Sequence, residues 1–147
     1  KMIFQEPRSS FDPRLTLGRS MRDALKPVMP DKKEQEREIG HLLELVGLDG
    51  SYAGMYPWQV SGGECQRAAI ARAIAQNPRF LICDEATSAL DEATEVAVLQ
   101  GLRALEPRPT CLLITHRKGV LKYCDRELCI REGSVTEECS TTTICTA

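Results

Sequence analysis

Short apolar runs alternate with helical patterns along the chain, and this order predicts a parallel sheet covered by helices. The runs at 80–83 and 111–114 predict buried strands, and residues 1–4 predict the end of a third. Helices with apolar faces are expected between these runs. Strand, helix and strand in this order favour an α/β fold with a parallel sheet.

Several local signals give the expected ends of these helices. Apolar residues recur at helical spacing over 17–25, and Pro27 ends that helix. The next helix begins at the capping pair Asp31 and Glu34, and Gly47 is its expected C-terminal cap. A further helix starts after Asp91. The Ser/Thr-rich tail from 139 to 147 has no period and is expected to be disordered.

The stretch Ser61-Gly62-Gly63 precedes an alanine-rich helix expected over 64–76. Two glycines after a serine predict a tight loop, in which Ser61 caps the helix. The free amides at a helix N-terminus and the helix dipole together favour an anion. A plain loop-to-helix junction explains the three residues equally well when they are taken alone.

Composition excludes some classes of function. The 147 residues are 42% apolar and 27% charged, and the net charge of −2 gives no nucleic-acid signature. No run of about 18 apolar residues predicts a membrane span. The seven cysteines form no C-x-x-C pair, which favours a reduced, cytoplasmic compartment over a zinc site. Because the first residue is Lys1, we expect the chain to be cut from a longer protein.

Polar side chains follow all three predicted strands. The residues at the strand ends are Gln5, the pair Asp84-Glu85 and His116. This position is informative because ligands bind beyond the carboxyl ends of parallel strands. Phosphoryl transfer needs such groups for positioning and charge neutralisation. We expect Asp84 to hold Mg²⁺, with the amide oxygen of Gln5 near the metal or the attacking water. Glu85 would be the general base and His116 would contact the γ-phosphate, while 61–63 would grip phosphate oxygens. The alternative for Asp84-Glu85 is a helix-capping acid pair.

Five motifs in the right order give a resemblance to the ATP-binding subunits of ABC transporters. The chain resembles them at the Q loop (4–7), the signature motif (60–64), Walker B (80–85), the D loop (88–91) and the switch histidine (115–116). The resemblance covers residues 1 to about 135. Residues 5–18 further resemble the dipeptide, oligopeptide and nickel importers.

The resemblance implies a fold, ligands and partners. It implies a partial P-loop NTPase fold: residues 1–10 end the Q-loop strand, 11–76 form an inserted helical subdomain, 77–135 belong to the α/β core, and 136–147 form a disordered tail. It implies ATP and Mg²⁺ as ligands, and it adds Glu64 and Asp91 to the ATP-binding residues. It also implies a second ATP-binding subunit, transmembrane permease subunits and a place on the cytoplasmic face of the membrane, without direct insertion.

Departures from the family pattern qualify this expectation. No G-x-x-x-x-G-K-[ST] segment occurs, so the Walker A loop is missing and the chain should not hydrolyse ATP alone. The alternative is a non-catalytic module that keeps the signature and docking faces. Arg117 stands where aspartate is common.

Loss of the Walker A strand should expose the flanks of 80–83 and 111–114 and favour oligomers or swapping at that edge. The aromatic residues Tyr52, Tyr56 and Trp58 are expected to be packing anchors, with a ligand platform as the alternative.

Overall fold

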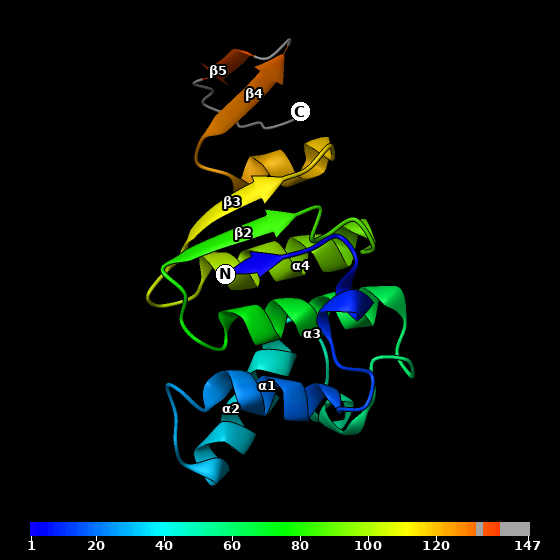
Figure 1. Cartoon of the computed structure of the whole chain (residues 1–147). Helices are drawn as coiled ribbons and strands as arrows, with labels where there is room; N and C mark the ends of the chain where they lie inside the picture. The colour runs from blue at the N-terminus through cyan, green and yellow to red at the C-terminus, as the bar shows by residue number, and fades with distance from the viewer. Residues whose placement is uncertain (132–133, 139–147) are drawn as a thin grey trace.

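Three parallel strands form the central sheet of the computed structural model, which describes residues 1–131 and 134–138 (Figure 1). They are β1 (Met2–Ile3), β2 (Phe80–Asp84) and β3 (Thr110–Ile114), in the order β1-β2-β3. The register pairs Ile3 with Cys83 and Asp84 with Ile114. All three strands therefore end at the same edge of the sheet, as the sequence pattern predicts.

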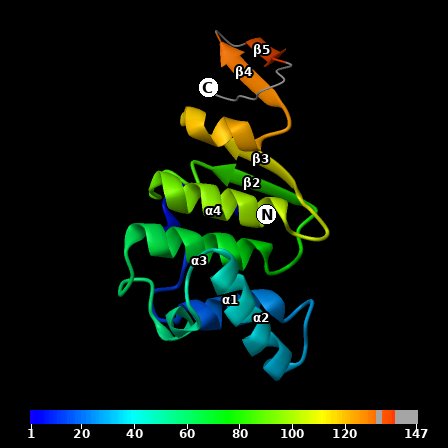
Figure 2. The same ribbon diagram turned by 180° about the vertical axis from the view of Figure 1, so that it is seen from behind.

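In the described part of the chain, four α-helices accompany the sheet: α1 (Leu17–Leu25), α2 (Lys32–Leu45), α3 (Gly62–Ile74) and α4 (Glu92–Arg103). Short 3₁₀ helices lie at Pro7–Ser10 (η1), Gly50–Gly54 (η2) and Lys118–Tyr123 (η3). Helices α3 and α4 cover the side of the sheet seen in Figure 2, and α1 and α2 lie beyond α3 (Figures 1 and 2). The predicted caps are confirmed: the side chain of Asp31 accepts from the amide of Glu34, and Gly47 has a φ of 71°.

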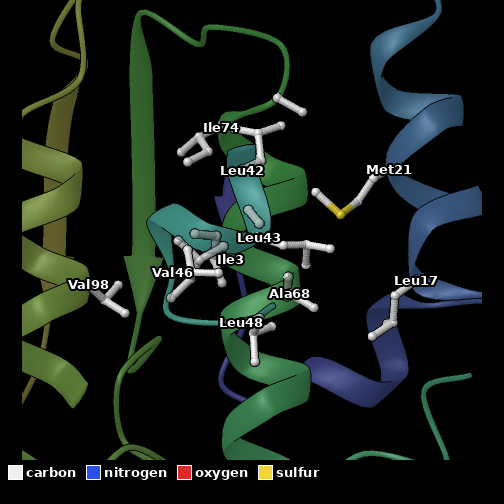
Figure 3. Packing of buried hydrophobic residues seen from close by; sticks show 14 of the residues in the cluster. Ile3, Leu17, Met21, Leu42, Leu43, Val46, Leu48, Ala68, Ile74 and Val98 are labelled. Atoms are coloured by element: carbon white, nitrogen blue, oxygen red, sulfur yellow. The ribbon is translucent and has the colours of Figure 1, made fainter. Parts of the chain in front are cut away.

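A continuous apolar core joins the helices to this side of the sheet (Figure 3). Leu17 and Met21 of α1 meet Leu43 of α2 and Ala68 of α3, and all four are fully buried or nearly so. The same cluster includes Ile3 of β1 and continues through β2 to α4. Side chains from elements far apart in sequence thus fix the position of the sheet edge relative to α3.

The opposite side of the sheet is not covered within the described residues. In β2 the side chains of Leu81 and Cys83 are buried, whereas Phe80 is exposed. Leu112 and Ile114, on the same face of β3, are also exposed. The expectation of a buried strand at 111–114 is therefore wrong. Only alternate residues of β2 meet the helices, and β3 lies at the margin of the sheet.

The expectation that 80–83 has an exposed flank is also wrong. Strand β2 lies at the centre and pairs with β1 on one side and β3 on the other. In the part of the chain that the structure describes, the edge of β3 that faces away from β2 has no strand partner. Of the two strands whose flanks were predicted to be open, only β3 is therefore at an edge of the sheet.

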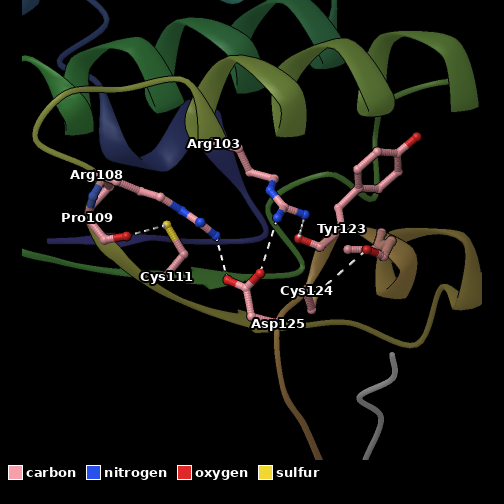
Figure 4. A network of polar contacts seen from close by, with 8 residues as sticks. Arg103, Arg108, Pro109, Cys111, Tyr123, Cys124 and Asp125 are labelled. Atoms are coloured by element: carbon pink, nitrogen blue, oxygen red, sulfur yellow. Dashed lines mark hydrogen bonds and ion pairs between the residues drawn. The ribbon is translucent and has the colours of Figure 1, made fainter. Parts of the chain in front are cut away.

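A second, antiparallel sheet consists of β4 (Glu127–Arg131) and β5 (Ser134–Glu138). Asp125 precedes β4 and receives hydrogen bonds from Arg103 at 3.1 Å and Arg108 at 2.5 Å (Figure 4). This carboxylate ties the start of the hairpin to the end of α4 and to the turn before β3. Residues 136–138, which the family resemblance assigns to a disordered tail, belong to β5, and residues 139–147 lie outside the described residues.

Two further expectations concern aromatic residues and membranes. Trp58 is 64% exposed and stacks on Tyr56 with ring centroids 5.6 Å apart, so the expectation that it anchors the core is wrong. Tyr52 is partly buried and packs against the core cluster, as expected. Among the described residues, no helix combines the length and apolar character that crossing a membrane requires.

Candidate functional site

The carboxylate of Glu85 is the centre of a polar cluster at the carboxyl ends of the strands. Nε2 of Gln5 donates to its Oε2 at 2.7 Å, and Nδ1 of His116 lies 3.1 Å from its Oε1. The three side chains come from the ends of β1, β2 and β3, and the structure brings them together as the sequence predicts. His116 is 67% exposed at its side chain, so the cluster is open to solvent.

Backbone geometry explains why these groups meet. The parallel register carries residue 5 alongside residue 85, and His116 lies two residues beyond the last residue of β3. The amide of Glu85 extends the sheet by donating to the carbonyl of Ile114 at 2.9 Å. Glu85 itself has a φ of 46°, in the left-handed region that is uncommon for residues with a side chain. Such strain persists only where surrounding contacts hold it, and it clusters at functional sites.

Asp84 is the last residue of β2 and is half-buried beside the cluster. Nε2 of Gln5 donates to Glu85, so the side-chain carbonyl oxygen of Gln5 is the atom that remains for a metal. Within the ranges the structure describes, no three His, Cys, Asp or Glu side chains gather as a metal site. Mg²⁺ usually takes one or two carboxylates and completes its shell with water and phosphate, so the donor set of Asp84 and Gln5 fits this ion.

The start of α3 carries the capping arrangement predicted for Ser61. Its hydroxyl accepts from the amide of Glu64 at 3.2 Å, and the carboxylate of Glu64 accepts from the amide of Ser61 at 2.7 Å. The hydroxyl of Tyr52 donates to the other oxygen of Glu64 at 2.7 Å. These bonds lower the pKa of Glu64, that from Tyr52 first. Both oxygens of Glu64 are thus engaged in shaping the loop, while Gly62 and Gly63 stand at the N-terminus, where amides lack helical partners.

The glycine at position 63 brings the start of α3 close to the loop that follows β2. A Cβ at Gly63 would lie 3.0 Å from the carbonyl oxygen of Ala89. Only a residue without a side chain permits this approach without displacement of the loop. The loop and the start of α3 therefore form one continuous surface.

Asp91 closes the same loop and caps α4. Its two carboxylate oxygens accept from the amide of Thr94 at 3.0 Å and from the hydroxyl of Thr94 at 2.7 Å. These hydrogen bonds hold the pKa of Asp91 below its usual range, the one from the hydroxyl first. In the structure Asp91 is a helix cap, and its predicted contact with ATP stays a prediction.

Three residues that were not predicted from the sequence join the segment after β1 to α3 and to the loop before α3. Arg8 donates to the carbonyl of Val60 at 2.7 Å, just before Ser61. Arg72 donates to the carbonyl of Ser10 at 2.7 Å, and Gln66 reaches the carbonyl of Phe4 at 3.4 Å. Their partners are main-chain carbonyls, which have no sequence signature, so no pattern in the chain could have revealed them.

A large cavity lies away from the polar cluster. It has a volume of about 540 Å³ and runs beside β3, between α4 and the segment before β4. Its lining includes the exposed side of β3 and neither Glu85 nor His116. The polar cluster is therefore not part of this cavity, and it is open to solvent at His116.

The chain forms part of a P-loop NTPase fold. This class is indicated by the parallel sheet with helices on one side, the polar residues at the strand ends and the glycine-rich start of α3.

The chain belongs to the ABC transporter family, whose model matches residues 1–88. It is 46% identical to the methionine import ATP-binding protein MetN of Geobacillus kaustophilus over 110 residues, or 73% of this chain and 32% of MetN. It is 39% identical to the oligopeptide transport ATP-binding protein OppF of Bacillus subtilis over 127 residues, or 84% of this chain and 42% of OppF. The chain thus spans about a third to two fifths of the length of these relatives.

Solved structures agree with this assignment. The dimeric structure of MJ0796, a bacterial ABC transporter cassette, superposes with a TM-score of 0.84 at 31% identity and covers 93% of this chain and 61% of the cassette. A second structure of that cassette, in a post-hydrolysis state bound to ADP and Pi, gives a TM-score of 0.78 at 30% identity, with 94% and 62% covered.

Proposed function

We propose that the chain is the signature-bearing part of an ABC transporter ATPase and supplies the groups that position water and sense the γ-phosphate. The observation that carries the proposal is the cluster of Gln5, Glu85 and His116, joined through 2.7 Å and 3.1 Å contacts at the strand ends. In such an ATPase the domain would comprise the strand end at 1–10, a helical subdomain at 11–76 and the core part at 77–135.

The cluster is suited to general-base chemistry. Glu85 is an acceptor with two partners, and its carboxylate can orient and deprotonate a water molecule in line with a phosphoryl group. With Glu85 ionised, the bond to Nδ1 of His116 requires the hydrogen on that nitrogen. Nε2 can then donate to a phosphate oxygen only if the ring is doubly protonated. Once Glu85 has taken a proton from water, it can itself donate to Nδ1, so the two side chains form one proton-coupled unit.

The remaining groups bind rather than react. Asp84 and the carbonyl oxygen of Gln5 would hold Mg²⁺, which neutralises phosphate charge when bound. Gly62 and Gly63 would present their amides to phosphate oxygens at the N-terminus of α3, where the helix dipole is positive. Glu64 and Asp91 would act on ATP indirectly, by shaping the two loops beside it.

A second subunit would complete the site. The start of α3 is exposed, the polar cluster is open, and no Walker A segment occurs in the sequence. A dimer in which this surface faces the phosphate-binding loop of the other subunit supplies the missing wall, and the solved cassette relative is described as dimeric. We further propose that permease subunits dock on the helical part and hold the protein at the inner face of the membrane.

Uptake of short peptides or nickel is the transport function that we propose for the complete subunit. The oligopeptide relative supports it, because it aligns over 127 residues against 110 for the methionine relative. Methionine uptake is the second candidate, favoured by the higher identity of 46%. Uptake assays with the complete transporter and either a labelled dipeptide or labelled methionine would separate them.

Nucleotide titration tests the proposed division of the site. We expect the 147-residue chain to show neither micromolar ATP binding nor hydrolysis, because most phosphate-binding amides belong to Walker A. If its gene encodes a G-x-x-x-x-G-K-[ST] segment upstream, the chain extended through that segment should bind and hydrolyse ATP. Micromolar binding by the short chain would contradict the proposal and favour a site built by swapping, whereas an inactive extended chain would favour a non-catalytic module.

A further inference from the structure

We propose that Arg117 is a positioning residue, which fixes the loop between β2 and α4 and thereby sets the carbonyl of Ala89 against Gly63. The loop, residues 85–91, runs from the carboxylate of Glu85 to the cap of α4. Arg117 directly follows His116, so two neighbouring side chains reach the two parts of this loop.

The guanidinium of Arg117 contacts two main-chain carbonyls. Its Nη1 donates to the carbonyl oxygen of Thr87 at 3.0 Å and to that of Leu90 at 2.9 Å. These carbonyls flank Ser88 and Ala89, which are exposed and make the tip of the loop. One planar group with two directed N–H bonds therefore holds both sides of the tip.

A buried carboxylate holds the guanidinium in place. Oε1 of Glu95 in α4 lies 3.3 Å from the same Nη1, and the Glu95 side chain is only 4% exposed, against 29% for Arg117. Both hydrogens of Nη1 already point at carbonyls, so this contact is an ion pair and not a third hydrogen bond. Among the residues that the structure describes, no donor reaches Oε1. A buried carboxylate without a cation is strongly unfavourable. Glu95 thus fixes Arg117 relative to α4.

These contacts connect the segment after β3 to the start of α3. His116 contacts the side chain of Glu85, and Arg117 holds the loop. The loop in turn places the carbonyl oxygen of Ala89 3.0 Å from the position that a Cβ on Gly63 would take. An aspartate at position 117 could not donate to either carbonyl. The consequence for ATP rests on the proposed function, since it requires that the cluster and the start of α3 both serve nucleotide. The role of Arg117 in positioning the loop does not depend on the proposed function.

Amide hydrogen exchange on the 147-residue chain, without nucleotide, tests the inference. The amides of Ser88 and Leu90 are informative, because they donate to the carbonyls of Glu85 and Thr87 within the loop. The test variant is Arg117→Gln combined with Glu95→Gln, which leaves no lone buried charge. We expect exchange of both amides to accelerate about tenfold and the Gly63 amide resonance to shift, while amides inside α3 keep their rates.

Two controls and a rescue make the result specific. Arg14→Gln, which removes an exposed arginine paired with Asp12, should leave the loop protected. Glu95→Gln alone keeps the carbonyl contacts of Arg117 but removes its ion pair, so it should accelerate exchange less than the double variant does. In Arg117→Ala with Glu95→Gln, millimolar methylguanidinium should restore protection where equal sodium chloride does not. Unchanged exchange at Ser88 and Leu90, or equal acceleration throughout the chain, would overturn the inference. If the protein fails to bind nucleotide, the hydrogen-exchange result can still be interpreted, because that failure bears only on the proposed function.

Discussion

At the scale of single residues, Glu85 shows how a strained position is maintained. Its left-handed backbone costs on the order of 1 kcal/mol for a residue with a side chain. Three contacts offset that cost: the amide bond to Ile114 and the side-chain contacts with Gln5 and His116. Strain and clustering thus occur at the same residue, which is where phosphoryl chemistry would need a fixed carboxylate.

Buried thiols give a residue-scale prediction for the effect of pH on stability. Burial raises the pKa of Cys83 from an ordinary 9.0 to about 12. Because the folded value is raised, the stabilisation is complete below pH 9 and is lost as pH rises, since the unfolded chain ionises first. The free energy of unfolding should fall between pH 9 and 12 by up to about 1.4 kcal/mol per pH unit from this group.

Urea denaturation at several pH values, compared between the parent chain and Cys83→Ala, measures this effect. The variant should show a shallower decline, and a small decline should persist because burial also raises the pKa of Cys65. Identical slopes for the two proteins would contradict the assigned cause.

The residues that sequence could predict differ in kind from those it missed. Gln5, Glu85 and His116 follow apolar runs, and the rule that parallel strands end together suffices to bring them into one place. Arg117 was visible only as an unusual residue, because its role depends on carbonyls that fold toward it from 27 and 30 positions away. The aromatic residue Trp58 was misjudged because residue type alone does not reveal which side of a loop faces solvent.

At the scale of elements, the helices were predictable and the strand environments were not. Apolar spacing and capping residues are local, so the ends of α1, α2 and α3 agree with the pattern to within about two residues. Burial of β3 depends on what covers it, and an apolar run carries no information about that. The run at 111–114 therefore predicted a strand correctly and its burial wrongly.

Two helical glycines give a matched test of packing between elements. A Cβ at Gly18 in α1 would lie 2.7 Å from the carbonyl oxygen of Ala53 in η2, whereas a Cβ at Gly40 in α2 meets nothing within 4 Å. Gly18→Ala should destabilise the protein by about 1–3 kcal/mol through this overlap. Gly40→Ala should stabilise it by about 0.5–1 kcal/mol through helix propensity.

Chemical denaturation of both glycine variants supplies the measurement. Opposite signs are expected because the two substitutions are chemically the same and differ only in the space around them. Equal stabilisation by both would show that α1 and η2 do not approach as closely as described.

At the scale of the whole molecule, one side of the sheet is covered and the other is apolar and open. Parallel sheets are normally covered on both faces, so the exposed Phe80, Leu112 and Ile114 mark a surface that another layer should cover. The unpaired edge of β3 adjoins this surface. Both features agree with a chain that spans 61% of the cassette it resembles.

We expect the isolated chain to self-associate through this surface, because open strand edges and exposed apolar patches pair with other chains. Light scattering after gel filtration should show a mass that rises with concentration across the micromolar range. Leu112→Lys should shift the chain toward monomer, whereas Val28→Lys, at an exposed apolar residue of the helical part, should not. A monomer at every concentration, or equal effects of both substitutions, would contradict the expectation.

ATP turnover by the upstream-extended protein tests the central role of the Glu85 cluster most directly. With Glu85→Gln the protein should still bind ATP, while the hydrolysis rate falls by about 10²- to 10⁴-fold through loss of the base. Glu92→Gln, at an exposed acid seven positions on, should hydrolyse at the parent rate. Hydrolysis by Glu85→Gln near the parent rate would contradict the account.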